Sequence, residues 1–290
     1  MNMVVALSGY SSYFDASRNK DNSAVLVAGY VSTLEEWAQF ELSYRLILAQ
    51  YDVPYFKMSE FIGRGAGTAF AQPKWQSESY RAQFISDIAL IIRSWTVASV
   101  CCGKKQELFD KYNSIYKLDE RFNTFAICAR DCAAQVRRFI RDIPSDLPIA
   151  YIFDQGDEGK GFLMKEMEAS KLPLPVFKRS RSNPEQDKDD PYAIQLQVSD
   201  LAAWEIRRGE QDWETGKSPS ELRKSLLALK HKVRIWKETK EPDLKGLIQV
   251  AGVQRRETNQ TPDQPTVPDK GQLENHYQYR DSSAYRNSRK

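Results

Sequence analysis

Histidine is scarce in this sequence, which has 290 residues but only two histidines, His231 and His276. A Ser/His/Asp triad or an HExxH zinc site needs histidine at defined spacings, and neither pattern occurs. The glycines of GRGAGTAF (63–70) are not followed by the Lys-Ser/Thr pair of a phosphate-binding P-loop, so we expect a mobile loop there. These absences argue against histidine-dependent catalysis and against a P-loop nucleotide site.

Cysteine pairing is also missing. None of the four cysteines lies in a CxxC pair; they are Cys101, Cys102, Cys128 and Cys132. The last two are four residues apart, as on one face of a helix. A structural zinc site is an alternative, but we expect reduced and mostly buried thiols. Such thiols are typical of a cytoplasmic protein, and we expect that localisation.

The sequence has no long apolar segment and no strong net charge. MNMVVALSGYSSYFD, at the start, lacks the basic and apolar regions of a signal peptide. The longest apolar stretch, 84–102, is interrupted by Asp87 and Arg93, so it predicts a helix followed by a strand and no membrane partner. The net charge of +3 does not by itself require a nucleic-acid partner.

Residues 254–290 are polar, interrupted by proline and almost free of aliphatic side chains. Such a segment buries too little apolar surface to offset the entropy of ordering it. We therefore predict one folded domain over residues 1–253 and a disordered polar tail over 254–290. The sequence does not indicate an oligomeric state.

Apolar periodicity within residues 1–253 predicts strands that alternate with helices. Two β-rich stretches separated by a polar turn predict an antiparallel hairpin over 3–15 and 24–32. Further strands are predicted at 94–102, 149–154 and 174–180, and helices from Thr33, over 77–93, 120–141, from 160, over 191–208 and over 218–237. The fold class is therefore α/β, with three layers.

Three acidic residues lie where apolar elements reach the surface. Asp15 and Asp154 end predicted strands, and Asp200 lies in a strongly apolar helix with Gln197 one turn earlier on nearly the same face. Carboxylates from separate elements suit Mg²⁺ or Mn²⁺, and two such ions can hydrolyse a phosphodiester. The alternative is that each acid caps a helix or a turn.

Two further acids, Asp157 and Glu158, follow Asp154 closely. Acidic residues stabilise a helix N-terminus, so we favour placing both in the first turn of the helix that begins near Gly159. The alternative is that they supply a fourth metal ligand. Glu60, in FKMSEF, is an additional candidate.

A basic segment precedes the Asp200 helix and could contact phosphates beside the acids. Its members are Lys178, Arg179 and Arg181. The predicted helix 218–237 also carries many cations around its apolar stripe, and we interpret these as a solvated face.

Four sequence blocks together resemble the conserved blocks of the domain-of-unknown-function 3800 family, over about residues 8–210. They are YFDASRNKDNSAVLVAGYVSTLEEW, YFKMSEF, YIFDQGDEGKG and YAIQLQVSDLAAWEIRR. That family is regarded as ribonuclease H-like and as comprising metal-dependent nucleases. The resemblance implies a mixed sheet flanked by helices, with Asp15 and Asp154 on adjacent central strands and Asp200 reaching in from a later helix.

The resemblance also assigns roles to residues. Asp15, Asp154 and Asp200 would be catalytic residues and ligands of Mg²⁺ or Mn²⁺, and Ser17, Gln197, Lys57 and Glu158 would be supporting groups. Lys57 stands where the family often has histidine, and could act as a phosphate-binding cation. Ala16 replaces the family's usual glutamate.

These observations predict a nuclease that hydrolyses phosphodiester bonds in nucleic acid. The alternative is a catalytically inactive relative that binds nucleic acid or a protein, in a phage-defence or mobile-element setting. A third interpretation is hydrolysis of a small phosphorylated metabolite. The type of nucleic acid is not indicated by the sequence.

Overall fold

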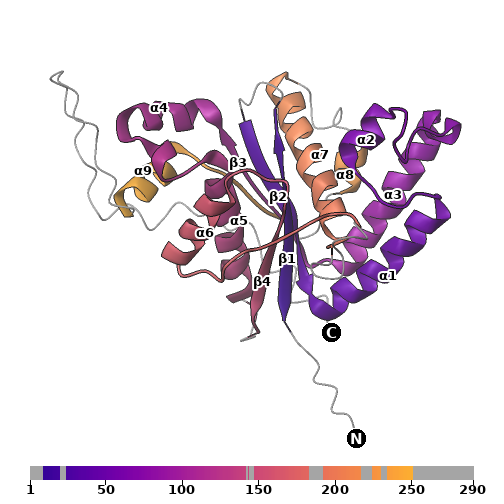
Figure 1. Ribbon diagram of the computed structural model, residues 1–290, viewed down its shortest axis with the longest axis horizontal. Helices are drawn as coiled ribbons and strands as arrows, with labels where there is room; N and C mark the ends of the chain where they lie inside the picture. Colours follow the sequence, from indigo (N-terminus) through magenta and orange to yellow (C-terminus); the bar gives the residue numbers. More distant parts are fainter. Residues whose placement is uncertain are drawn as a thin grey trace, which may run out of the picture.

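One mixed sheet of six strands organises the molecule (Figure 1). The computed structural model describes residues 9–19, 24–141, 143, 147–182, 192–216, 224–229 and 234–250. The strands are β1 (Tyr10–Arg18), β2 (Ala24–Thr33), β3 (Ala98–Lys105), β4 (Ile149–Asp154), β5 (Val176–Lys178) and β6 (Arg234–Glu238). Their order across the sheet is β5-β4-β1-β2-β3-β6.

Strand directions follow from the connections. The first three strands form an antiparallel meander, whereas β4 pairs with β1, β5 with β4 and β6 with β3 in parallel. Parallel neighbours require crossover connections, and helices supply them. The predicted antiparallel hairpin is confirmed for β1 and β2; residues 3–8 of that prediction lie outside the described residues.

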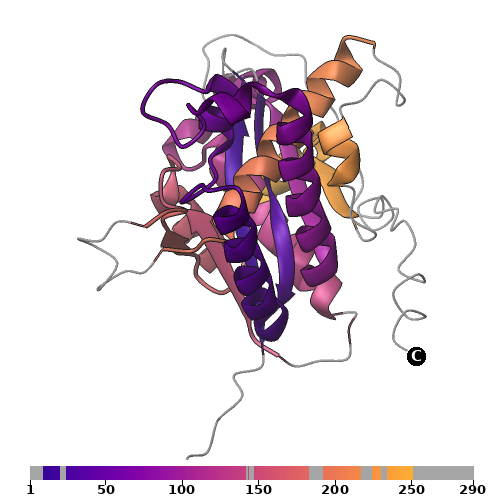
Figure 2. The ribbon, with the colours of Figure 1, turned by 90° about the vertical axis from the view of Figure 1, so that its right-hand side faces the viewer.

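Helices cover both faces of the sheet, as Figures 1 and 2 show. On one side lie α1 (Leu34–Gln50), α2 (Met58–Gly63), α3 (Glu78–Trp95), α7 (Leu196–Glu214) and α8 (Lys224–Ala228). On the other lie α4 (Gln106–Tyr116), α5 (Thr124–Arg141), α6 (Lys160–Ala169) and α9 (Glu241–Val250). Two short 3-10 helices occupy Pro73–Gln76 and Leu118–Glu120. The three-layer α/β prediction is confirmed. Within the described residues, no helix is long and apolar enough to cross a membrane.

The start of α1 is fixed by its sequence. The Thr33 Oγ1 accepts a hydrogen bond from the Glu36 backbone N–H at 3.2 Å, and the Glu36 Oε2 accepts one from the Thr33 N–H at 3.5 Å. This reciprocal capping box satisfies two backbone donors that the helix cannot use. The predicted helix start at Thr33 is therefore confirmed.

The C-terminal part of the domain differs from the prediction. The prediction of a single helix over 218–237 is wrong, because α8 covers only Lys224–Ala228 and residues 234–238 form β6. In RIWKE the side chains alternate between exposed and half-buried, which is the strand period, and the edge of β3 supplies a partner. Three helices, α2, α4 and α9, were not predicted, and α7 continues beyond residue 208.

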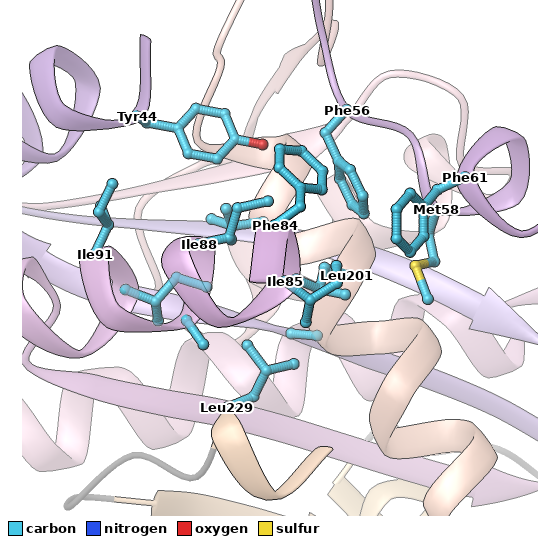
Figure 3. Packing of buried hydrophobic residues seen from close by; sticks show 14 of the residues in the cluster. Tyr44, Phe56, Met58, Phe61, Phe84, Ile85, Ile88, Ile91, Leu201 and Leu229 are labelled. Carbon is cyan, nitrogen blue, oxygen red and sulfur yellow. The ribbon is translucent and has the colours of Figure 1, made fainter. Parts of the chain in front are cut away.

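Alternate residues of the sheet feed two cores. Phe14 and Val27 pack towards α5, whereas Leu26 and Tyr30 pack towards α1, α3 and α7. Figure 3 shows the second core, where Phe56, between α1 and α2, lies among aromatic and aliphatic side chains. This packing fixes the segment that precedes α2 against α7. The four cysteines form no disulfide with one another and are buried, which agrees with the prediction of buried thiols.

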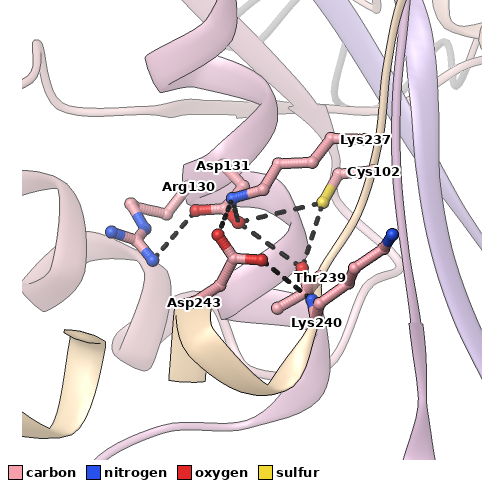
Figure 4. Close-up of polar contacts among 7 residues, drawn as sticks. All are labelled: Cys102, Arg130, Asp131, Lys237, Thr239, Lys240 and Asp243. Carbon is pink, nitrogen blue, oxygen red and sulfur yellow. Dashed lines mark hydrogen bonds and ion pairs between the residues drawn. The ribbon is translucent and has the colours of Figure 1, made fainter. Parts of the chain in front are cut away.

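A buried polar cluster joins β6 and α9 to α5 (Figure 4). The Asp131 carboxylate of α5 pairs with Arg130 at 2.9 Å and with Lys237 at 3.1 Å. Lys237 also pairs with Asp243 at 3.0 Å, and Cys102 lies 3.4 Å from the Thr239 hydroxyl. Because each charge in this cluster has an opposite charge beside it, we interpret the cluster as structural.

Candidate metal and phosphate site

Asp15 and Asp154 lie side by side on neighbouring parallel strands. The β1–β4 register runs to Phe14 opposite Phe153, and each acid is the next residue of its strand. The two phenyl rings stack 5.0 Å apart in the core beneath α5. Since successive side chains of a strand point to opposite faces, both carboxylates point to the α7 face.

Asp200 and Gln197 bring α7 to the same place. The Asp200 Oδ2 accepts a hydrogen bond from the Met58 N–H at 2.8 Å, and the Gln197 Oε1 accepts one from the Phe56 N–H at 2.8 Å. The Gln197 Nε2 donates to the Ser180 carbonyl at 2.7 Å. The prediction that this amide and carboxylate point together is confirmed, and Gln197 ties two loops to α7.

Four carboxylates influence one another at this position. Burial raises the pKa of Asp15 well above its usual value, and the charges of Asp200, Asp157 and Asp154 raise it further. Burial also raises the pKa of Asp200, although the Met58 N–H and Lys57 oppose the change. Clustered like charges disfavour their own ionisation. The sheet and α7 therefore bring together carboxyl groups that resist ionisation.

Asp157 belongs to this cluster, contrary to the preferred prediction. The α6 helix begins at Lys160 with Gly159 as its N-cap, so neither Asp157 nor Glu158 is in its first turn. The Asp157 Oδ2 is buried and has no hydrogen-bond partner among the described residues. Burial and the charge of Asp154 raise the pKa of Asp157 to about 7. Asp154 and Asp157 form a D-x-x-D pattern at the end of a strand, and this spacing was the sequence signal that could have placed Asp157 in the cluster.

Glycine at position 159 explains the tight approach to α6. Its φ is +95°, which glycine adopts at low cost, and a Cβ there would lie 1.9 Å from the Asn123 Nδ2. Asn123 in turn accepts a hydrogen bond from the Ala126 N–H at 2.7 Å, near the start of α5. The turn that carries Asp157 is thus fixed by the start of another helix. Glu158, in the same turn, is exposed.

Backbone capping accounts for part of this arrangement. The Asp154 Oδ1 accepts the Gly156 N–H at 2.7 Å, and the Asp15 Oδ1 accepts the Ala16 N–H at 2.7 Å. Asp200 similarly accepts a hydrogen bond at the first residue of α2. These bonds agree with the capping alternative at each position taken singly. They do not explain why four acids share one location.

Oxygen donors of this kind suit a hard divalent cation. The unpartnered Asp157 oxygen and the mutual repulsion of the carboxylates fit such an ion. However, no three His, Cys, Asp or Glu side chains in the described parts of the chain converge into a formed metal site. The carboxylate oxygens are therefore of the chemical type that Mg²⁺ or Mn²⁺ prefers. To coordinate such an ion, the carboxylates would have to move closer together.

Basic side chains surround the acids. Lys57, the exposed N-cap of α2, lowers the pKa of Asp200 and of Asp157 by its charge, and Arg18 and Lys160 act likewise on Asp157. A phosphate that approached the acids would meet these cations.

The predicted phosphate-contacting residues lie along β5 and the segment after it. Lys178 is opposite Asp154 in the β4–β5 register. Arg181 pairs with Glu60 at 3.3 Å and lies over the Tyr55 ring. The Arg179 carbonyl accepts the Ala193 N–H at 2.8 Å, which anchors this segment near the start of α7.

Ser17 lies on the same face of β1 as Asp15, two residues further along the strand, and its hydrogen bonds are made with a different group of polar side chains. The Arg207 Nε donates to the Ser17 Oγ at 2.7 Å, and the Arg207 Nη1 donates to Asn19 at 3.1 Å. Arg207 is two turns after Asp200 on α7. The serine is therefore held by arginine rather than by an acid of the cluster.

Replacing Asp15 with asparagine is expected to raise the melting temperature by about 3 °C at pH 8 with a chelator present. The pKa of folded Asp15 is raised above 3.8, so ionisation lowers stability as the pH rises past that value. The amide cannot ionise and keeps the acceptor for the Ala16 N–H. Calorimetry across the pH range should show the advantage shrinking as the pH falls towards 3.8. An unchanged melting temperature at pH 8 would contradict the raised pKa of Asp15.

No protein-family model matches this chain, and no curated protein matches it. The likeness to the 3800 family rests on the four sequence blocks.

Proposed function

We propose that this chain is a divalent-metal-dependent nuclease with a ribonuclease H-like fold, and that the acidic cluster binds Mg²⁺ or Mn²⁺. The observation that carries the proposal is the common position of Asp15, Asp154, Asp157 and Asp200. Burial, together with the charge of Asp154, raises the pKa of Asp15, Asp157 and Asp200. Gathering like charges costs stability unless a cation offsets it. The resemblance to the 3800 family implies the same function for three of these acids.

The placement of the acids supports the ribonuclease H-like interpretation. That interpretation requires Asp15 and Asp154 on adjacent central strands and Asp200 on a later helix, and these residues lie on β1, β4 and α7. The central β1 is antiparallel to β2 and parallel to β4, as in a mixed sheet.

Each group in the site has a proposed task. Asp15, Asp154 and Asp200 would hold the cation, with Asp157 as a further oxygen donor. A bound divalent ion would activate water and neutralise charge on the phosphate. Gln197 would act as a positioning residue, because its amide bonds the backbone of Phe56 and of Ser180, in two loops that lie against α7 near Asp200.

The cations around the acids would bind the nucleic-acid backbone. Lys57 would contact a phosphate beside Asp200, which is a task that suits an ammonium group better than neutral acid–base chemistry near pH 7. Lys178, Arg179 and Arg181 would continue this contact along the chain that follows β5. Such contacts recognise phosphate and not base sequence.

Titration of Mn²⁺ into the protein by calorimetry tests the proposal. Binding is expected in the wild type and is expected to vanish in Asp154→Asn, because the amide loses the charge but keeps the acceptor for the Gly156 N–H. Asp52→Asn is a matched control, since the Asp52 side chain is 80% exposed and, within the described residues, is paired only with Lys74 at 3.5 Å. No binding in the wild type, with or without an oligonucleotide, would overturn the metal assignment.

Two observations favour a catalytically inactive binding module as the second candidate. Lys57 stands where the family often has histidine, and the described acids do not converge into a formed site. A labelled oligonucleotide would distinguish the two. A triple alanine variant of Asp15, Asp154 and Asp200 would lose cleavage in a nuclease, whereas a binding module would show no cleavage in either protein and equal binding in both.

A further inference from the structure

A pocket of about 500 Å³ lies on the opposite face of the sheet from the acids. Its walls come from β4, from α5 and from the turn that ends α6. The polar residues that line it are Arg137, Tyr151 and Lys171, and the apolar ones include Ile149, Leu172 and Pro173. Its volume is within the range of sites for small organic ligands.

Tyr151 gives this pocket an unused hydrogen-bonding group. The side chain points to the α5 face together with Phe153, and it is fully buried. Among the described residues its hydroxyl has no hydrogen-bond partner. Buried hydroxyl groups are nearly always paired, so an unpaired one that lines a pocket points to a ligand.

Positive charge lies beside this hydroxyl. The Arg137 Nη1 donates to the Lys171 carbonyl at 2.8 Å, which holds the guanidinium against the wall of the pocket. Burial raises the pKa of Tyr151, and the Arg137 charge lowers it, with burial the larger effect. The hydroxyl is therefore protonated at neutral pH and can donate a hydrogen bond.

The backbone of this wall is set by its turn. Lys171 adopts a φ of +53°, and the Leu172 N–H donates to the Met167 carbonyl at 2.9 Å. This arrangement ends α6 and buries Leu172. Two cationic residues and one buried hydroxyl thus lie beside an apolar surface, and a small movement of the residues that cover the hydroxyl would let a ligand reach it.

We propose that this pocket binds a small organic anion, with a carboxylate or phosphate group held by Arg137 and Tyr151 and an apolar body against Ile149, Leu172 and Pro173. An inorganic anion would leave the apolar wall unused, and a neutral apolar molecule would leave the hydroxyl unpaired. The pocket is independent of the proposed nuclease site, because none of its lining residues belongs to the acidic cluster.

Three probes of similar size or charge test this assignment by calorimetry on the full chain: benzoate, benzyl alcohol and inorganic phosphate. Benzoate is expected to bind at least tenfold more tightly than either of the others, because it alone has both a charge and an apolar ring. Tyr151→Phe is expected to weaken benzoate binding by about tenfold, which is the effect of one hydrogen bond to a charged group. Arg137→Gln should weaken it at least as much.

Matched variants keep this test interpretable. Tyr151→Phe removes a hydroxyl that makes no hydrogen bond to any described residue, so its folding should be intact, and its circular dichroism and melting temperature would check this. Arg141→Gln changes an exposed arginine one turn further along α5, and should leave benzoate binding unchanged. Absence of benzoate binding to the wild type would overturn the proposal. So would equal binding to the wild type and to both pocket variants.

Discussion

Asp200→Asn is expected to lower the rate of phosphodiester cleavage by about 10³-fold, the scale seen when one preorganised electrostatic group is lost from an active site. Asparagine has nearly the same shape and keeps an oxygen that can accept the Met58 N–H. The cap on α2 therefore remains, and only the charge is removed. The variant separates the role of a helix cap from that of a metal ligand, which alanine would not do.

Initial rates on labelled single-stranded RNA and DNA, measured with Mn²⁺, would check this result. Asp52→Asn again serves as the control, because its carboxylate is exposed and its charge is not one of those that raise the pKa of Asp15. Wild-type rates in Asp200→Asn would show that the residue is only a cap. Loss of activity together with a lower melting temperature would point instead to damage of the fold.

Gly29→Ala is expected to destabilise the protein by about 3 kcal/mol or more, at the upper end of the cost of overpacking. Gly29 lies on β2 opposite Phe14 of β1. A Cβ at this position would lie 1.8 Å from the Tyr13 carbonyl oxygen and 3.1 Å from the Phe14 Cα. These atoms are backbone, so no side-chain rotation can relieve the clash, and the two central strands must separate.

Urea denaturation would measure the loss, with Gly161→Ala as the comparison. Gly161 lies in α6, and an added Cβ would meet nothing within 4 Å. Alanine is expected to stabilise that helix by about 0.5–1 kcal/mol relative to glycine. Equal midpoints for Gly29→Ala and the wild type would show that β1 and β2 can adjust, and that the spacing beside Asp15 is not fixed by Gly29.

Sequence patterns predicted the parts of the fold that depend on local order. The hairpin, the cap at Thr33 and the strand that ends at Asp154 each follow from signals within a few residues. The β6 strand was missed because the leucines before it continue a helical spacing, while its strand state depends on the distant edge of β3.

The candidate site was predicted in part for the same reason. The apolar surroundings of Asp200 and Gln197 on one helix predicted their common direction, and the structure agrees. Asp157 was assigned to the first turn of a helix because acids favour such positions, whereas α6 begins only at Lys160 and the Asp157 Oδ2 is buried. The sequence could not predict that the Tyr151 hydroxyl lacks a hydrogen-bond partner among the described residues. That property depends on how β4, α5 and the end of α6 pack together.

The central position of β1 also sets the order in which the molecule can assemble. Its pairing with β2 closes a short loop, whereas its pairing with β4 must wait for a segment that lies far along the chain. Closing long loops slows folding, so the meander is expected to form before β4 docks. Asp15 would then be in place on the sheet before Asp154 joins it, and the repulsion between the two carboxylates would arise only when β4 pairs with β1. A divalent cation would then act late in folding, on the nearly finished sheet, and it would stabilise the native state without accelerating the first steps.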